Sequence, residues 1–256
     1  MTMMMRIGNG LFYYLPVVLL VMAWDLSLRV GILSQEIAPS PGATADALVS
    51  MFASGDLTAN ARISLFRELS GLAISVVVGV IVGVGMARIE WFRILIRPSI
   101  TFLYPMPKSA LIPILLLWFG LGHMSKIAAV FLGCLLPMVI SSYNGARGVE
   151  PQLIWSARSL GASRTRVIFK IILMAALPDI MSGVRIAVAL SWLLLVSAEM
   201  MISQNGLGYL ISYYGETGDY ANMFAAVSVV IALGYFSDRF FLMIMRRILR
   251  WREMPS

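Results

Sequence analysis

The sequence predicts an all-α integral membrane protein with about six transmembrane helices, and three observations lead to this prediction. The chain of 256 residues is 59% hydrophobic and only 13% charged, whereas an ordinary soluble domain has about 25% charged residues. Its mean hydropathy is +0.85. Long apolar runs recur along the chain, separated by short basic or turn-rich stretches. A soluble fold of this size could not bury so much apolar side chain, so lipid must be the solvent for part of it.

The first apolar run, Leu11–Leu28, is long enough to cross the roughly 30 Å of hydrocarbon in a bilayer. Only Arg6 carries charge before it, which also fits a cleaved signal peptide. Because no small-residue cleavage site is evident after the run, we favour a retained span. Residues 29–63 are polar, and we expect a short helix at Thr44–Ala53.

A second span is expected at Ser64–Ala87. Small residues recur in it every four positions: Gly71, Ser75, Gly79 and Gly83. This spacing places them on one face of a helix and allows a neighbouring helix to approach closely. A substrate path along the same groove is the alternative interpretation.

A basic stretch that contains Arg88, Arg93 and Arg97 is expected to form a short loop before a third span at Ile100–Leu121. The third span contains Pro105, Pro107 and Pro113. Proline removes backbone hydrogen bonds, so this helix should be kinked or broken. Such a break within a membrane is tolerable only against protein or a wet cavity.

A fourth span is expected at Ile127–Ser142, a fifth at Ile180–Met201 and a sixth within Ala221–Ile248. The stretch at residues 202–220 between the last two is polar and turn-rich. A cluster of arginines follows the sixth span.

The passage Glu150–Pro178 is the longest polar and basic stretch of the chain. Pro151 suits the first position of a helix and Gly161 the left-handed position just after its end. Ser163 is expected to cap a second helix that closes near Pro178. One face of the first helix collects the apolar residues Leu153, Ile154, Ala157 and Leu160. A short amphipathic helix between two spans suits docking of a partner, although it also fits a helix lying on the membrane surface.

The distribution of basic residues gives an orientation. With the N-terminus inside, the cytoplasmic segments contain thirteen of the 20 Lys and Arg residues, and the outer segments contain only Arg29, Arg62, Arg67 and Lys126. The positive-inside rule therefore places both termini and the Glu150–Pro178 passage in the cytoplasm.

The residues give no sign of catalysis. The chain has no Gly-rich Lys-Ser/Thr loop for ATP and no Ser/His/Asp set. Its single histidine, His123, and single cysteine, Cys134, make a metal site and an internal disulfide improbable. Basic residues punctuate apolar spans instead of forming a patch with aromatic residues, which argues against a nucleic-acid partner. We therefore expect no enzyme activity, metal or cofactor in this chain.

Ionisable groups inside membrane spans are candidates for a translocation path. Lys108 either faces a central path, where it would attract an anion, or extends its side chain to the membrane interface. Tyr104 and Met106, beside it, either form a gate or pack against neighbouring side chains. Glu199 either fixes the following glycine-rich turn or lies near substrate entry. Arg185 is expected to extend to the interface and to pair with Asp179. Asp238, with Arg239, is expected to form a helix-packing contact or an ion pair.

Five fragments resemble one family, and they occur in order along the chain: Pro105–Gly122, Ser156–Ser163 with Ala176–Pro178, Ala198–Met200, Gly206–Leu210 and Asp238. They are similar to permease subunits of binding-protein-dependent ABC importers, and most of all to the sulfonate, taurine, nitrate and bicarbonate branch. In the family's cytoplasmic Glu-Ala-Ala loop, a glycine follows the triplet after three residues. Ala157 and Gly161 match the third and last positions of that pattern. Trp155 and Ser156 replace the usual Glu and Ala.

The resemblance implies the type I importer permease fold. It divides the chain into an N-terminal helix, first span and periplasmic segment (1–63), a core (64–248) with a cytoplasmic coupling loop (145–178), and a cytoplasmic tail (249–256). It also implies that an ABC ATPase docks on a set of coupling-helix residues: Leu153, Ile154, Trp155, Ala157, Arg158, Leu160 and Gly161.

The resemblance further implies partners and a location. ATP and Mg would be bound by the separate ATPase subunits. A periplasmic or lipid-anchored binding protein would deliver a small anion such as a sulfonate, nitrate or bicarbonate. A second permease copy would complete the pore in the lipid of a bacterial inner membrane. A self-sufficient secondary transporter or channel is the alternative, but it would need a midplane ion site and usually an inverted repeat, and neither is evident.

Overall fold

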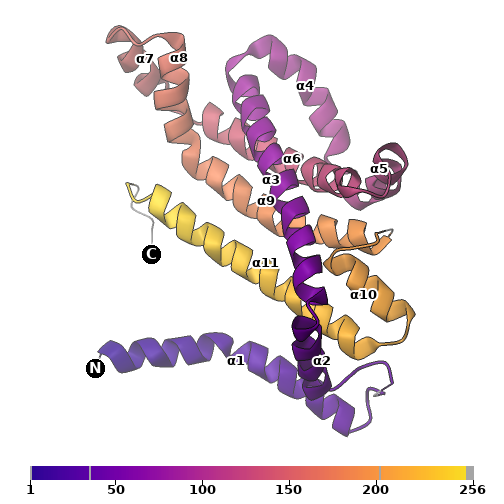
Figure 1. Ribbon diagram of the computed structural model, residues 1–256. Helices are drawn as coiled ribbons and strands as arrows, with labels where there is room; N and C mark the ends of the chain where they lie inside the picture. The colour runs from indigo at the N-terminus through magenta and orange to yellow at the C-terminus, as the bar shows by residue number, and fades with distance from the viewer. Residues whose placement is uncertain (1, 35, 202, 252–256) are drawn as a thin grey trace.

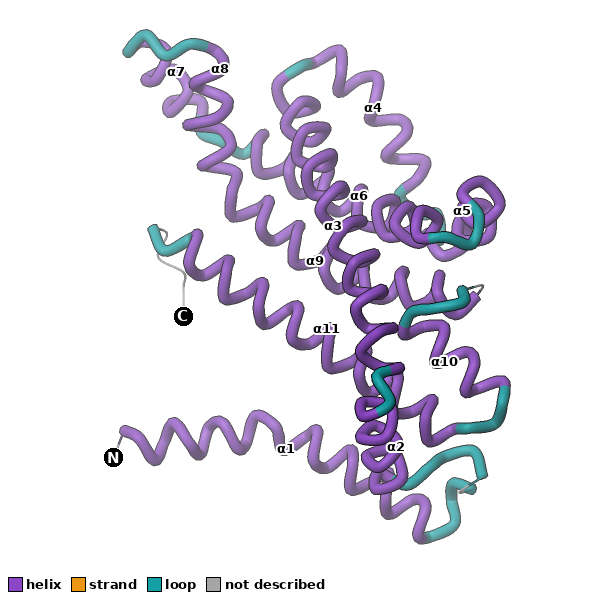
Figure 2. The backbone as a smooth tube through the Cα atoms, in the orientation of Figure 1, coloured by secondary structure: helices purple, strands orange, loops and turns teal. Residues whose placement is uncertain are grey.

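The computed structural model describes residues 2–34, 36–201 and 203–251, with side chains from residue 15 onward. Within these residues the fold is all-α, because helices alternate only with loops (Figures 1 and 2). The elements are α1 (Thr2–Arg29), α2 (Pro41–Ala53), α3 (Asp56–Arg88), α4 (Glu90–Leu103), the 3-10 turn η1 (Lys108–Leu111), α5 (Ile112–Phe119), α6 (His123–Arg147), α7 (Pro151–Ser159), α8 (Arg164–Val167), the π-helical turn η2 (Ile168–Ile172), α9 (Leu173–Met201), α10 (Leu207–Glu216) and α11 (Tyr220–Ile248).

The core of the bundle is formed by α3, α6 and α9. Gly71, Gly79 and Gly83 of α3 face α6 so closely that a Cβ atom added to any of them would overlap it. At Gly79 that atom would lie 2.4 Å from the Cβ of Met138. The predicted close helix approach is confirmed. Since α6 fills this face of α3, the alternative of a substrate groove along it is wrong.

The third span is broken, as the prolines predict. The axes of α4 and of the η1–α5 segment differ by 96°. Pro105 and Pro107 lie in the non-helical connection, and Pro113 lies in the first turn of α5. The predicted basic loop is wrong, because Arg93 and Arg97 belong to α4. Apolar residues at helical spacing around the two arginines stabilise an amphipathic helix there.

The helix that begins at Arg164 continues without interruption to Met201, through η2 and α9. The predicted end near Pro178 is therefore wrong. Proline removes one backbone bond, but Ala176 and Ile180 on either side are buried in the core and hold the helix together.

At the end of the bundle opposite to α7 and α8 lie α2 and α10 (Figure 1). The predicted helix at Thr44–Ala53 is confirmed and begins at Pro41, where the Ser40 side chain accepts a hydrogen bond from the Ala43 amide. The polar, turn-rich stretch at residues 202–220 also contains a helix, α10, which the sequence analysis did not identify. Leu207, Leu210 and Ile211 are buried and stabilise α10 against its neighbours.

In the described chain, four helices are each long and apolar enough to cross a membrane: α3, α6, the continuous helix Arg164–Met201 and α11. A fifth span is possible if α4 and the η1–α5 segment, which are bent relative to each other, cross together. The predicted first span, Leu11–Leu28, falls within α1, and the side chains of its residues 11–14 lie outside the description. These four or five spans, together with the predicted span within α1, agree with the predicted number of about six. The predicted domain boundary after residue 63 falls inside α3, and residues 252–256 of the predicted tail lie outside the described residues.

Candidate functional site: an exposed terminal helix, a mid-span cavity and a buried ion pair

The helix α7 ends in a hydrogen-bonded turn that fixes its direction. Gly161 has φ of +81°, which glycine adopts without strain. Its amide donates to the Arg158 carbonyl at 2.9 Å, and the Ala162 amide donates to the Ala157 carbonyl at 3.0 Å. This pair of bonds is the Schellman arrangement of a helix C-terminus. The chain therefore reverses sharply after α7.

The reversal leads directly into a membrane span. The Ser163 side chain accepts a hydrogen bond from the Arg166 amide at 3.4 Å and begins α8, as predicted. Since α8, η2 and α9 form one continuous helix, only the short Leu160–Ser163 connection separates α7 from a spanning helix. A displacement of α7 would therefore be transmitted to α9.

The side chains of α7 divide into two groups. Ile154 and Ala157 pack against the chain's own core. Trp155 is 65% exposed and Leu160 is 88% exposed, and Leu153 and Arg158 are also exposed. The sequence placed Leu153, Ile154, Ala157 and Leu160 on one docking face, but the structure leaves only the exposed members available to another protein.

A cavity of about 680 Å³ lies between η1, α6 and α9 and is open on one side. Tyr104 and Lys108 line it. The Lys108 ammonium donates to the Tyr104 carbonyl at 2.7 Å and lies 5.8 Å from the centre of the Tyr104 ring. Met106 is half-buried and is not among the residues that line the cavity.

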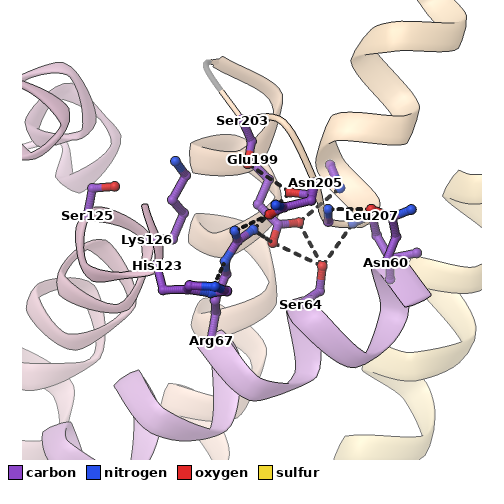
Figure 3. A network of polar contacts seen from close by, with 12 residues as sticks. Asn60, Ser64, Arg67, His123, Ser125, Lys126, Glu199, Ser203, Asn205 and Leu207 are labelled. Carbon is purple, nitrogen blue, oxygen red and sulfur yellow. Dashed lines mark hydrogen bonds and ion pairs between the residues drawn. The ribbon is translucent and has the colours of Figure 1, made fainter. Parts of the chain in front are cut away.

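Glu199 lies elsewhere, in a buried network between the N-terminal part of α3 and the C-terminal end of α9 (Figure 3). Its carboxylate accepts from the Arg67 guanidinium at 2.7 Å and from the Ser64 hydroxyl at 2.8 Å. The Gly208 amide donates to it at 3.0 Å. Arg67 is 1% exposed and Glu199 is 0% exposed. Of the two predicted roles of Glu199, the structure shows its part in fixing the glycine-rich turn.

The same network holds the loop before α10. Arg67 donates to the backbone carbonyl of Asn205 at 2.9 Å and also to its side-chain oxygen. The Ser64 hydroxyl accepts from the Leu207 amide at 2.8 Å, and the Asn60 side chain accepts from the Gly206 amide at 2.7 Å. Three residues over about two turns of α3 thereby fix the path of the chain from α9 to α10.

Two neighbouring residues complete this region. His123, at the start of α6, accepts a hydrogen bond from Arg67 at its Nδ1 atom, 3.2 Å away. Lys126 is fully buried and donates to the Leu121 carbonyl at 2.6 Å. No group of three or more His, Cys, Asp or Glu residues within the described ranges could hold a metal ion.

Sequence reasoning missed most of this network, although a signal for it exists. Asn60, Ser64 and Arg67 follow the i, i+4, i+7 spacing of one helix face, and that face continues into Gly71 and Gly79. Polar residues that share a helix face with small residues indicate that this face contacts a neighbouring helix. The partner, Glu199, lies 132 positions further along the chain, so its identity required the fold.

The predicted partner of Arg185 is wrong. Arg185 pairs with Asp238 of α11, with 2.9 Å between Nε and Oδ1. The predicted ion pair at Asp238 is confirmed. Asp179 lies against α6 instead, where its Cβ packs close to Gly145.

Comparisons with known proteins find related membrane proteins. Residues 75–250 match the family described as binding-protein-dependent transport system inner membrane component. A relative from Escherichia coli, assigned as the aliphatic sulfonates transport permease protein SsuC, is 37% identical over 93% of this chain and 90% of its own length. The taurine transport system permease protein TauC of Escherichia coli is 30% identical over 91% of this chain and 86% of its own length.

Among solved structures, an inward facing conformation of the MetNI methionine ABC transporter matches with a TM-score of 0.60. The match covers 73% of this chain and 93% of that chain at 20% identity. At this identity the likeness establishes a shared fold.

Proposed function

This chain belongs to the family of binding-protein-dependent transport system inner membrane components, and we propose that it carries a small anion across a bacterial inner membrane with energy from ATPase subunits docked on α7. It is the membrane-spanning permease subunit of an ABC importer. Because the family depends on separate binding proteins, the self-sufficient secondary transporter or channel is not favoured.

The observation that carries the docking proposal is the exposed apolar surface of α7. Trp155 and Leu160 are strongly exposed, and α7 lies at one end of the molecule (Figure 1). Exposed large apolar side chains outside the lipid region are typical of protein contacts. The nearby Arg158 is exposed and suits an acidic rim on the partner.

Transmission follows from the rigid connection between α7 and α9. When two ATPase subunits close on ATP, each would carry an α7 helix with it, and the turn at Gly161 would pass the displacement to the spanning helix. Closure would open the outer side of the path, and ATP hydrolysis would reverse the change. ATP and Mg would be held entirely by the ATPase subunits.

The orientation and assembly belong to the same proposal. Thirteen of the 20 Lys and Arg residues support cytoplasmic termini and a cytoplasmic α7. The outer surface formed by α2 and α10 would then receive a periplasmic or lipid-anchored binding protein. The cavity lined by Lys108 is open on one side. This opening supports a homodimer in which a second permease copy closes the open side of the cavity.

The cargo is proposed to be an anion of the sulfonate class. Two relatives are assigned to aliphatic sulfonates and to taurine. Nitrate, bicarbonate and organic acids share the negative charge and are the competing substrates in an uptake assay.

The test compares Gly161→Pro with Gly161→Ala in the complex with the cognate ATPase and binding protein. Proline cannot adopt φ of +81° and lacks the amide that donates to Arg158. We expect Gly161→Pro to insert in the membrane normally but to abolish stimulation of ATP hydrolysis by the loaded binding protein. Gly161→Ala, strained by only about 1–2 kcal/mol, should retain part of the stimulation.

A surface pair separates docking from folding. Leu160→Asp should lower co-purification of the ATPase, because it places a charge on the exposed apolar surface. Ser159→Asp, at the neighbouring exposed polar position, is the matched control and should co-purify as the wild type does. Normal coupling in Gly161→Pro together with normal co-purification of Leu160→Asp would refute the docking proposal.

A further inference from the structure

The cavity between η1, α6 and α9 lies deep within the membrane spans. Its α6 wall runs from Gly133 to Ser141, which begins roughly 15 Å from the start of α6 and ends roughly 9 Å before its end at 1.5 Å per residue. Its α9 wall runs from Ile186 to Ser197 and likewise stops short of both ends of the helix. Lys108, which lines the cavity, therefore lies beside the middle of both helices.

Lys108 has no counter-charge among the described residues. No carboxylate of the described residues lies within 4.0 Å of its ammonium group. Of its three N–H donors, the Tyr104 carbonyl receives one. An ammonium group within the span region is costly unless it pairs with an opposite charge or contacts water in a cavity.

Two hydroxyl groups in the same cavity are available to a ligand. The side chains of Ser109 and Ser141 line the cavity and form no hydrogen bond with any described residue. Ser197, also in the lining, already donates to the Leu193 carbonyl at 2.8 Å. The lining contains no Asp or Glu. Its free polar groups are thus an ammonium and hydroxyl donors, which match an anionic oxygen acceptor.

The backbone around the cavity also indicates a polar interior. Pro137 and Gly133 of α6 both lie in the lining. Because proline has no amide hydrogen, Pro137 cannot donate the usual helical hydrogen bond to the Gly133 carbonyl. The 3-10 turn η1 interrupts regular α-helix on the opposite wall. Irregular backbone at membrane depth is tolerated where it is buried in protein or lines a water-filled cavity.

From these observations we propose that this cavity is an anion-binding site within the import path, where Lys108 supplies the charge and the hydroxyls of Ser109 and Ser141 donate to the anion's oxygens. The remaining walls, including Leu136, Ile140 and Leu190, fit a short aliphatic chain. A small aliphatic sulfonate combines both features. The inference rests on the proposed import of an anion, of which it names the intramembrane binding site.

Thiol labelling tests the charge of the cavity without any transport assay. Ser141→Cys, in the purified complex, is treated with a methanethiosulfonate that carries a sulfonate group and, separately, with one that carries a trimethylammonium group. Charged clefts raise association rates of opposite charges about tenfold or more. With each rate divided by the rate of the same reagent toward a small free thiol, we expect the sulfonate reagent to be favoured at least about tenfold, and Lys108→Gln in the same background to abolish this preference.

Controls keep the labelling result decisive. Cys134, the single native cysteine, is buried, so the unmodified chain should show no labelling. Ser109→Cys provides a second reporter if Ser141→Cys assembles poorly. Equal relative rates for both reagents, a higher relative rate of the cationic reagent, or no reaction at either reporter would overturn the proposal.

Uptake distinguishes this inference from the proposed function. With the complex in liposomes, ATP-driven uptake of ethanesulfonate should fall about tenfold in Lys108→Gln, the effect of losing a hydrogen bond to a charged group. Lys108→Arg should retain most of the uptake, and Ser228→Ala, on the exposed part of α11, should leave it unchanged. If the wild-type complex imports no anion, the proposed function fails. If it imports ethanesulfonate and Lys108→Gln does so equally well, only the binding site is refuted.

Discussion

Arg67 and Glu199 illustrate how single residues stabilise this protein. Both side chains are almost completely buried, and the ion pair between them is supported by Ser64, Asn205 and the Gly208 amide. Removing two charges from water is costly, and their attraction offsets that cost only when further hydrogen bonds satisfy both groups. The network meets this condition, because Arg67 also donates to Asn205 and His123, and the Glu199 carboxylate also accepts from Ser64 and the Gly208 amide (Figure 3).

Glu199→Gln should therefore destabilise the protein strongly. The variant keeps the shape of the side chain but leaves Arg67 with an uncompensated buried charge, which costs about 3–5 kcal/mol. We expect a clearly lower thermal unfolding temperature of the detergent-purified protein. Glu216→Gln, an exposed carboxylate at the end of α10, is the control and should unfold like the wild type. Equal unfolding temperatures for Glu199→Gln and Glu216→Gln would show that the pair contributes little.

Residue-level prediction was uneven, for a physical reason. Gly161 could be assigned from the sequence because a left-handed turn after a short helix depends only on neighbouring residues. The partner of Arg185 could not, because Asp179 and Asp238 are both plausible until the packing of α9 against α11 is known. The division of α7 into packed and exposed side chains required the tertiary structure as well.

At the scale of elements, the contact between α3 and α6 depends on missing side chains. Gly83 lies so close to α6 that a Cβ atom there would be 2.6 Å from the Val139 carbonyl oxygen and 2.6 Å from the Cβ of Ser142. A backbone oxygen cannot move aside as a flexible side chain can. Close backbone approach of this kind is a principal means of helix association in lipid.

Gly83→Ala should consequently separate the two helices. The added methyl group overpacks the contact, at a cost of about 1–3 kcal/mol. We expect a lower thermal unfolding temperature and a smaller yield of folded protein in detergent. Gly234→Ala in α11 is matched, because a Cβ atom there meets nothing closer than 3.9 Å, and alanine favours a helix over glycine by about 0.5–1 kcal/mol. Similar stability of both variants would contradict the packing argument.

Element boundaries were predicted well where local signals dominate. The prolines of Pro105–Pro113 predicted the break between α4 and α5, and Ser163 predicted the start of α8. The helix α4 was not identified from the sequence. The loop prediction relied on the charge of three arginines and did not consider the helical spacing of the apolar residues between them. Nor did it reveal that α8 and α9 are continuous, since the cost of Pro178 is offset by burial of the residues around it.

At the scale of the whole molecule, lipid and partner chains must cover much of the surface. An 18-residue apolar window of α11 contains no buried residue, and large apolar side chains of α1, such as Leu20 and Met22, are exposed. In water such a surface would aggregate. The start of α1 and the end of α11 lie on the same side of the bundle in Figure 1, which agrees with an even number of crossings.

Alkaline phosphatase fusions test that topology. The enzyme needs disulfides and is active only outside the cytoplasm. We expect activity for fusions in the loop between α10 and α11, at Gly218, and none for fusions at Gly148 or at the C-terminus. A tag before α1 should be protected from protease added to intact cells with a permeabilised outer membrane. Activity at Gly148 would reverse the orientation and remove α7 from the cytoplasmic ATPase.

The amino-acid sequence by itself determined the membrane class, the approximate number of spans, the family resemblance and the short helix that ends at Gly161. These depend on hydropathy, local backbone preferences and short motifs, all of which act between near neighbours in the chain. Only the tertiary structure decided that Glu199 pairs with Arg67, that Arg185 pairs with Asp238, and that Lys108 shares a cavity with Ser141. Those contacts join residues from different helices, and their free energy depends on which faces pack together, which no local pattern specifies.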